Sequence, residues 1–228
     1  MIHNRKLNPI FDSKPSVGHR LNLKLSLPYI KNKHVLDVGC WAGQFEQLAL
    51  KHVSKITGID PEKEAIDYAK KQIPTASFKV GSALKIPYPN ASFDAVVFCD
   101  VIEHLPINTE KKALKEISRV LKSNGKLILA TPNSHILSIL LDPAYFLIGH
   151  RHYSLDTLYK MLTATGFRVV STYQSAGIFR LLSSFIDALS KKFTNKKFVY
   201  PDWFKNKIEN ELFSGGFAQN HIIAQKLP

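Results

Sequence analysis

The segment 35–45, which reads VLDVGCWAGQF, constrains the fold of this chain more than any other stretch. It begins with an apolar run typical of a strand buried on both faces, and Asp37 interrupts that run near its end. Gly39 and Gly43 flank a tight turn, where the missing Cβ atoms let the backbone approach a ligand closely. Apolar residues at helical spacing follow over 44–51. A strand, turn and helix of this kind binds a ligand at the carboxyl end of an open parallel sheet.

The residues of this turn favour a cationic ligand over a phosphate group. The dinucleotide-binding fingerprint G-x-G-x-x-G has a middle glycine where this chain has Trp41, so the fingerprint fails. Asp37 would also repel a phosphate dianion at this position. A carboxylate is better matched to an ammonium group, and S-adenosylmethionine carries both an amino group and a sulfonium.

Two motifs resemble those of a known enzyme family. V-L-D-V-G-C-x-x-G resembles motif I of the class I S-adenosylmethionine-dependent methyltransferases, which usually read D-x-G-x-G-x-G; Trp41 departs from that pattern. The run DVIEHL at 100–105 resembles the segment after the fourth strand in a superfamily that includes the ubiquinone-biosynthesis O-methyltransferases. It lacks the Asn/Asp-Pro-Pro-aromatic tetrad of enzymes that methylate nucleobase amino groups. The motifs therefore predict a methyltransferase, and a glycine turn without a ligand is the alternative interpretation of the first motif.

The resemblance also implies which residues hold S-adenosylmethionine. Asp60 ends the second strand at the distance from the glycines where an acid binds ribose hydroxyls, although Asp also favours helix caps. Pro61 joins this set and is expected at the first position of the next helix. Arg20 could meet the cofactor carboxylate or be an ordinary surface arginine. In this assignment Asp37, Gly39 and Gly43 hold the methionine moiety, Asp60 the ribose, Ser82 and Ala83 the adenine, and Cys40 and Asp100 line the sulfonium region.

His104 and His152 are the candidate catalytic residues. His104 is the titratable group nearest the expected reaction centre, and imidazole can accept a hydroxyl proton near neutral pH; a structural role is the alternative. His152 belongs to the apolar loop 134–153, which either lines an acceptor pocket or packs against neighbouring helices. The run His150-Arg151-His152 has no third ligand in evident metal spacing, so no metal site is predicted.

Composition narrows the partners only in part. The formal net charge of +13 suits a nucleic acid, an acidic substrate or an anionic membrane surface, and a lysine-rich solvated surface explains it equally well. Two cysteines without metal-ligand spacing indicate no disulfide framework, so a reducing cytoplasmic compartment is expected. The N-terminus lacks the apolar region of a secretory signal. The apolar run 136–141, stopped by Asp142 and Pro143, is too short to span a membrane.

Strands alternate with helices along the chain, which predicts a doubly wound α/β fold. The resemblance implies a Rossmann-like seven-stranded sheet, mostly parallel, with the last strand antiparallel. A helix over 110–121 is expected to end with Gly125 in the left-handed conformation. We expect an N-terminal arm and cover over 1–33, then a methyltransferase domain over 34–228 with an insertion at about 177–217. The basic amphipathic part of the insertion, 179–197, could contact a membrane, cover the substrate site, form a dimer contact or pack against the core.

We therefore predict an S-adenosylmethionine-dependent methyltransferase that releases S-adenosylhomocysteine. The acceptor is expected to be a small molecule, with lipid-linked and saccharide acceptors included, and its oxygen is favoured over nitrogen as the methylated atom. The alternatives are an RNA methyltransferase that uses the basic surface and a non-catalytic module that only binds the cofactor.

Overall fold

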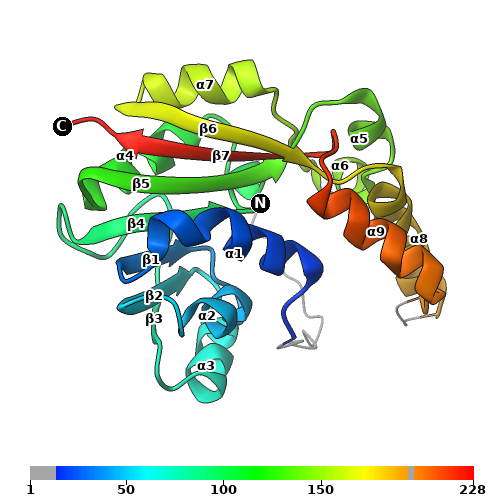
Figure 1. Cartoon of the computed structure of the whole chain (residues 1–228), viewed down its shortest axis with the longest axis horizontal. Coiled ribbons are helices and arrows are strands. Elements are labelled where there is room, and N and C mark those ends of the chain that lie inside the picture. The colour runs from blue at the N-terminus through cyan, green and yellow to red at the C-terminus, as the bar shows by residue number, and fades with distance from the viewer. Residues whose placement is uncertain (1–13, 195–197) are drawn as a thin grey trace.

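Seven strands form one mixed sheet in the computed structural model, which describes residues 14–194 and 198–228 (Figure 1). The strands are β1 (His34–Val38), β2 (Lys55–Asp60), β3 (Ser77–Val80), β4 (Phe93–Cys99), β5 (Leu121–Pro132), β6 (Phe167–Ser175) and β7 (Gln219–Lys226). Their order across the sheet is β3-β2-β1-β4-β5-β7-β6. Strands β1 to β5 pair in parallel, whereas β7 is antiparallel to both neighbours. The predicted doubly wound sheet with an antiparallel last strand is confirmed.

Helices cover both faces of this sheet. They are α1 (Val17–Ile30), α2 (Gln44–Ala49), α3 (Lys63–Gln72), the 3₁₀ helix η1 (Ile102–His104), α4 (Glu110–Val120), α5 (Ile136–Leu140), α6 (Pro143–Ile148), α7 (Leu155–Thr163), α8 (Ile178–Thr194) and α9 (Asp202–Phe213). Helices α1, α2 and α3 pack on one face, and α4 and α7 pack on the other. Helices α5, α6, α8 and α9 gather beyond the carboxyl ends of β5 and β6 (Figure 1). Residues 1–13 of the expected arm and 195–197 of the expected insertion lie outside the described residues.

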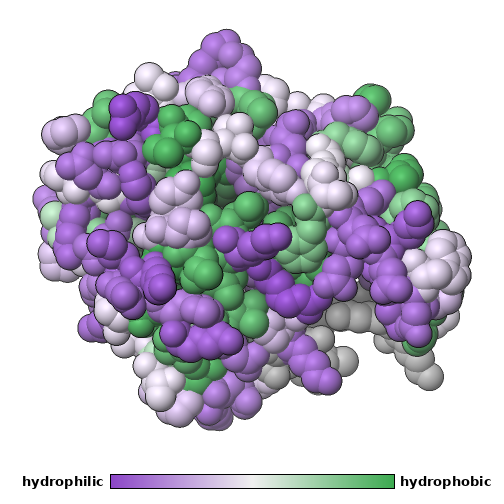
Figure 2. Space-filling view, viewed as in Figure 1, coloured by the Kyte–Doolittle hydropathy of each residue, from purple (hydrophilic) through white to green (hydrophobic). Residues whose placement is uncertain are grey.

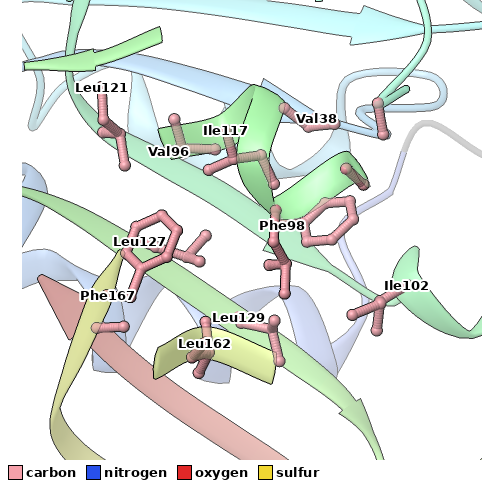
Figure 3. Close-up of a cluster of buried hydrophobic side chains, with 14 of the residues drawn as sticks. Val38, Val96, Phe98, Ile102, Ile117, Leu121, Leu127, Leu129, Leu162 and Phe167 are labelled. Atoms are coloured by element: carbon pink, nitrogen blue, oxygen red, sulfur yellow. The ribbon is translucent and has the colours of Figure 1, made fainter. Parts of the chain in front are cut away.

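The larger hydrophobic cluster lies between the sheet and helices α4 and α7 (Figure 3). Strand β5 shows how the sheet contributes to it. Leu127 and Leu129 belong to this cluster, whereas Ile128 between them belongs to the cluster on the α1 and α2 face, because successive side chains of a strand point to opposite faces. Each fully buried large side chain contributes about 1.5–3 kcal/mol. Burial on both faces therefore holds the parallel strands in place, so that their carboxyl ends lie along one edge of the sheet.

Several local expectations differ from the structure. The segment expected as a loop over 134–153 contains two short helices, α5 and α6, and the Asp142 side chain accepts the Ala144 backbone N–H to begin the second. Asn124, rather than Gly125, adopts the left-handed conformation. Helix α3 begins at Lys63, so Pro61 is not its first residue. Among the described residues, no helix has both the length and the apolar character needed to cross a membrane.

Helices α8 and α9, which stand between β6 and β7 in the chain, are tied together by one carboxylate. The Glu211 side chain of α9 accepts the backbone N–H groups of Gly177, Phe179 and Arg180, at 3.2, 3.1 and 3.0 Å. The first backbone N–H groups of a helix have no partner within the helix, and negative charge is favourable there. Glu211 therefore fixes the start of α8 against α9.

Replacing this cap should loosen α8. In Glu211→Gln the side chain loses its charge and one of its two acceptor oxygens, so we expect a loss of about 1–3 kcal/mol in local stability. Amide hydrogen exchange at Phe179 and Arg180, together with denaturant unfolding, measures this loss. The matched control is Glu209→Gln in the same helix, because Glu209 forms an exposed ion pair with Arg20 that should contribute less than about 1 kcal/mol. Equal effects of the two substitutions would contradict the capping role.

Candidate functional site

The turn after β1 has the backbone of a glycine-rich ligand loop. Gly39 has a φ of +87°, and a Cβ added there would lie 2.3 Å from Cγ2 of Val101 in the loop after β4. No side chain fits in that space. Trp41 occupies the position of the missing middle glycine and still adopts a positive φ of 47°. The turn thus keeps the conformation that glycine favours despite the substitution, at a cost of about 1–2 kcal/mol.

Asp60 joins this turn to the end of β2. Its Oδ2 accepts the backbone N–H of Trp41 at 3.1 Å, and its Oδ1 accepts that of Glu62 at 2.8 Å. Burial raises the pKa of the Asp60 carboxyl, although these two hydrogen bonds oppose the rise. Each carboxylate oxygen has a second lone pair, so both can still accept a hydroxyl from a ligand. Asp60 was also a candidate helix cap in the sequence. In the structure its side chain accepts a backbone N–H in the turn before α3, and not one within the helix itself.

Two further acids are buried beside the turn. Asp37 is only 5% exposed, and burial, followed by the charge of Asp60, raises its pKa to about 8. Glu46 of α2 is fully buried, and neither of its carboxyl oxygens has a hydrogen-bond partner among the described residues. Burial and the nearby Asp37 raise the pKa of Glu46 as well. Uncompensated acids of this kind favour a cation that can lie next to them.

The other predicted cofactor residues are placed differently. The Cys40 side chain packs with Ile66, Ala69 and Phe78 in the cluster under α3, and burial raises the pKa of its thiol. The Ser82 hydroxyl accepts the backbone N–H of Leu84, and Ala83 is buried in the larger hydrophobic cluster. The Arg20 guanidinium pairs with Glu209. These side chains therefore do not converge on the turn as Asp37 and Asp60 do.

A cavity of about 230 Å³ opens at the carboxyl ends of β4 and β5. Asp100 lines it from the loop after β4, with a positive φ of 59° that costs about 1–3 kcal/mol in a residue with a side chain. Its Oδ1 accepts Nε2 of Gln219 at 2.6 Å. Desolvation by the surrounding walls raises the pKa of Asp100, while Arg180 and Gln219 act against the rise. The other titratable side chains in the wall are Glu103, His104, Asp142, His150, His152 and Arg180.

Asp142 joins the two histidines of the 150–152 run. Its Oδ2 lies 2.6 Å from Nδ1 of His150 and 2.9 Å from Nε2 of His152. Burial would raise the pKa of Asp142, but the bonds with the two histidines outweigh it and hold this pKa well below the usual range. The sequence interpretation treated Asp142 only as the end of an apolar run, because eight and ten residues separate it from the histidines. The missing third donor is therefore supplied by the fold of α5 and α6.

Glu103 lies beneath the same cavity and was not identified from the sequence. One of its oxygens, Oε2, accepts the Thr131 hydroxyl at 3.0 Å, and the other, Oε1, lies 3.7 Å from Nε2 of His150. Burial and the charge of Asp100 raise the pKa of Glu103. Two sets of three donor atoms lie within 4.8 Å of one another: Glu103, His104 and His150, and Asp142, His150 and His152.

Arg151 links the histidine run to the loop after β4. Its guanidinium donates to Glu110 Oε1 at 2.7 Å and to the carbonyls of Ile102 and Leu105 at 3.0 and 2.5 Å. The run at 150–152 thus places a histidine on each side of an anchored arginine. These contacts hold the two walls of the cavity at a fixed separation.

Known proteins match the part of the chain that carries the turn and the loop after β4. Residues 36–129 match the family described as a methyltransferase domain. An O-methyltransferase from Pyrenophora dematioidea is 32% identical over 156 residues, covering 60% of this chain and 55% of that protein. A ubiquinone biosynthesis O-methyltransferase from Coxiella burnetii is 30% identical over 152 residues, covering 62% of this chain and 61% of that protein. The chain thus spans between half and two thirds of the length of these curated relatives.

A solved structure of a SAM-dependent methyltransferase from Archaeoglobus fulgidus shares the fold. It has a TM-score of 0.65 and 21% identity, and the match covers 92% of this chain and 95% of that one. At this identity the likeness shows the fold alone. The family match at 36–129 includes Asp37, Asp60 and Asp100 but ends before Asp142 and the two histidines. Asp142, His150 and His152 form what we call the histidine wall of the cavity. This wall therefore lies outside the matched domain segment.

Removing the charge at Asp37 should stabilise the protein. The unfolded carboxyl ionises near pH 4, whereas the pKa of the folded group is about 8, so the folded state binds more protons in between. The free energy of unfolding therefore falls as the pH rises through this window. Asp37→Asn removes that loss, and we expect it to raise the free energy of unfolding at pH 8 by a few kcal/mol in denaturant titrations.

Asp94→Asn is the matched control, and we expect it to change the free energy of unfolding in the opposite direction. The ion pair with Lys122 and the His34 backbone N–H outweigh burial and lower the pKa of Asp94, so its ionised form stabilises the folded state above about pH 4. This substitution should therefore destabilise the protein at neutral pH. An Asp37→Asn protein that is less stable than the native one at pH 8 would contradict the assignment of Asp37 as an uncompensated acid.

Proposed function

Because residues 36–129 match the family described as a methyltransferase domain, we propose that this protein binds S-adenosylmethionine at the turn after β1 and methylates an acceptor in the adjoining cavity. The observation that supports this most strongly is the pair of buried acids, Asp37 and Asp60, at the ends of neighbouring strands β1 and β2. Asp37 has no cationic partner among the described residues, and the cofactor has an ammonium group to offer it.

The residues of the turn fit this cofactor. Asp37 would receive the ammonium group, and the remaining lone pairs of Asp60 would accept the ribose hydroxyls. Gly39 and Gly43, both with positive φ, let the backbone approach the methionine moiety. When bound, the cofactor supplies a methyl group on a positively charged sulfur. The roles of Pro61, Ser82 and Ala83, and of Cys40 through its backbone, follow the family assignment and stay predictions, as does that of Arg20.

The chain's own contribution to the reaction is to position the acceptor and take up its proton. Holding two reactants in line can provide about 7–11 kcal/mol of the barrier reduction. His104 lines the cavity, as Asp100 does, and is the better candidate for the base. The ring nitrogens of His152 both contact protein oxygens, Nδ1 at Asn133 O and Nε2 at Asp142, and its side chain is only 2% exposed. His152 thus fits a holding role better than proton transfer.

We infer an oxygen acceptor on a small molecule with an apolar portion. Two relatives are named O-methyltransferases. Ser138, Leu141 and Asp142 of the α5–α6 region line the cavity, and the outer faces of these helices expose apolar side chains. Figure 2 shows hydrophobic side chains gathered over α5 at the upper right. The exposed apolar residues of this rim include Ile136, Leu140, Phe146 and Leu147. Such a rim suits a lipid-linked acceptor or peripheral contact with a membrane, to which α8 adds Phe185, Leu189 and Phe193.

Calorimetric titration with S-adenosylmethionine and S-adenosylhomocysteine tests the cofactor site. The native protein should bind both, and Asp37→Asn should weaken binding about 10- to 100-fold, because a charge-assisted hydrogen bond of roughly 1.5–3 kcal/mol is lost. This variant is expected to be more stable, so lost binding cannot result from unfolding. Asp67→Asn, which removes an exposed carboxylate paired with Lys63, should bind as the native protein does. Absence of binding by the native protein would remove the proposal, and release of S-adenosylhomocysteine from pools of hydroxylated compounds would identify the acceptor.

Vesicle flotation tests the apolar rim. At low salt the native protein should float with anionic vesicles, and the double substitution Phe146→Ser and Leu147→Ser should reduce the bound fraction several-fold, because both side chains are mostly exposed. Tyr159→Ser on α7, another exposed aromatic residue, is the matched control and should leave binding unchanged. If the native protein does not float, the membrane contact is wrong and the rim would serve the acceptor alone.

A further inference from the structure

We propose that Asp142, His150 and His152 form a binding site for a divalent transition-metal ion, which holds an oxygen atom of the methyl acceptor in the cavity. The acceptor part of this proposal rests on the proposed function. Metal binding does not, because it follows from the three side chains alone.

The three donor atoms already lie close to one another. Oδ2 of Asp142 lies 2.6 Å from Nδ1 of His150 and 2.9 Å from Nε2 of His152, and the three donor atoms lie within 4.8 Å of one another. The Asp142 side chain is anchored through its other oxygen, Oδ1, which accepts the Ala144 backbone N–H at 2.9 Å. One carboxylate oxygen and two imidazole nitrogens therefore lie close enough together for one ion to contact all three, and the carboxylate is held in a fixed orientation.

The hydrogen bonds of His152 indicate that a positive charge belongs between it and Asp142. Nδ1 of His152 lies 2.9 Å from the carbonyl oxygen of Asn133, which can only accept a hydrogen bond. The Ser138 hydroxyl, 3.4 Å from the same nitrogen, donates to the carbonyl of Ala218. Nδ1 must therefore carry the hydrogen, and Nε2 of the neutral ring then directs a lone pair at a carboxylate oxygen. Two facing lone pairs are favourable only with a cation or an additional proton between them.

His150 has a matching arrangement. It directs Nδ1 toward Asp142, and its other nitrogen, Nε2, faces Oε1 of Glu103 at 3.7 Å. In metal sites a ligating histidine usually donates its second ring N–H to a carboxylate or a backbone carbonyl, which fixes its orientation. Here Glu103 and Asn133 O would fill these two supporting positions.

The composition of the site selects the kind of metal. Two histidines and one carboxylate bind Zn²⁺ or Fe²⁺ and leave coordination positions open, whereas Mg²⁺ and Ca²⁺ prefer sites made only of oxygen atoms. Asp142, His150 and His152 all line the cavity, so an open position can face a bound molecule. An acceptor hydroxyl bound there would have a lowered pKa. Its O–H bond breaks with the proton passing to the imidazole of His104 and the electron pair staying on the oxygen.

The direct test is a titration of chelator-treated native protein with Co²⁺, whose visible absorption reports nitrogen and oxygen ligands, followed by displacement with Zn²⁺. We expect one equivalent of metal per chain. Asp142→Asn keeps the side-chain shape and the bond to Ala144, and should weaken binding at least about 10- to 100-fold. Mg²⁺ should not displace Co²⁺.

His52→Gln is the matched control, since His52 lies just before β2, at the amino-terminal edge of the sheet and away from the cavity. It should bind Co²⁺ as the native protein does. If the native protein binds no more Co²⁺ than Asp142→Asn, the proposal is overturned, and the three side chains are joined by hydrogen bonds alone. Circular dichroism of each variant excludes loss of the fold as the cause.

A second titration separates the metal site from the methyltransferase proposal. Acetohydroxamate, an oxygen-donor probe, should change the Co²⁺ spectrum of the native protein if a coordination position is open to the cavity. An unchanged spectrum would overturn the role in acceptor binding. Calorimetry with S-adenosylmethionine on the same sample shows whether the cofactor site works, so failure of the proposed function and failure of the metal site give different results.

Discussion

The site depends on burying acidic side chains where water can hardly reach them. Asp37 and Glu46 lie under the glycine turn without a basic partner among the described residues, and Glu103 lies under the cavity. Burying an ionised carboxyl without compensation costs several kcal/mol, which is why the pKa of each is raised. The hydrophobic clusters on the two faces of the sheet must outweigh that cost. Stability is therefore supplied by the core, while the edge of the sheet keeps buried acids that a bound cation would stabilise.

The parts of the site that could be predicted from sequence are those set by neighbouring residues. Asp37, the glycine turn and Asp60 follow buried strands directly, and parallel strands bring their carboxyl ends to one edge. The apolar runs also indicated the sheet, because strands covered on both faces need continuous apolar residues. The sequence indicates the burial of Glu46 only weakly. Glu46 is an acid three residues before Ala49, and this spacing places it on the buried side of α2. The two acids and the glycine turn of the proposed cofactor site were thus largely present in the local pattern.

The histidine wall could not be predicted in the same way. Asp142 meets His150 and His152 only because α6 reverses the chain between them, and that reversal depends on Gly149, which ends α6 in the left-handed conformation. Short helices such as α5 and α6 gain little from intrinsic propensity and form through tertiary packing. Trp41 shows the same limit for the backbone. Its positive φ is accompanied by a hydrogen bond from its N–H to Asp60, nineteen residues away in the chain.

The loop after β4 is where the two halves of the site meet. Val101 fills the space left by Gly39, so this loop supports the glycine turn. The same loop carries Asp100, Glu103 and His104 into the cavity wall, and Arg151 binds its carbonyls from the histidine run. Any shift of the histidine wall must therefore move this loop or break the bonds of Arg151. A misplacement of about 1 Å between reactants can cost 100-fold in rate, so the proposed reaction would need a rigid link of this kind between the glycine turn and a wall built outside the matched domain.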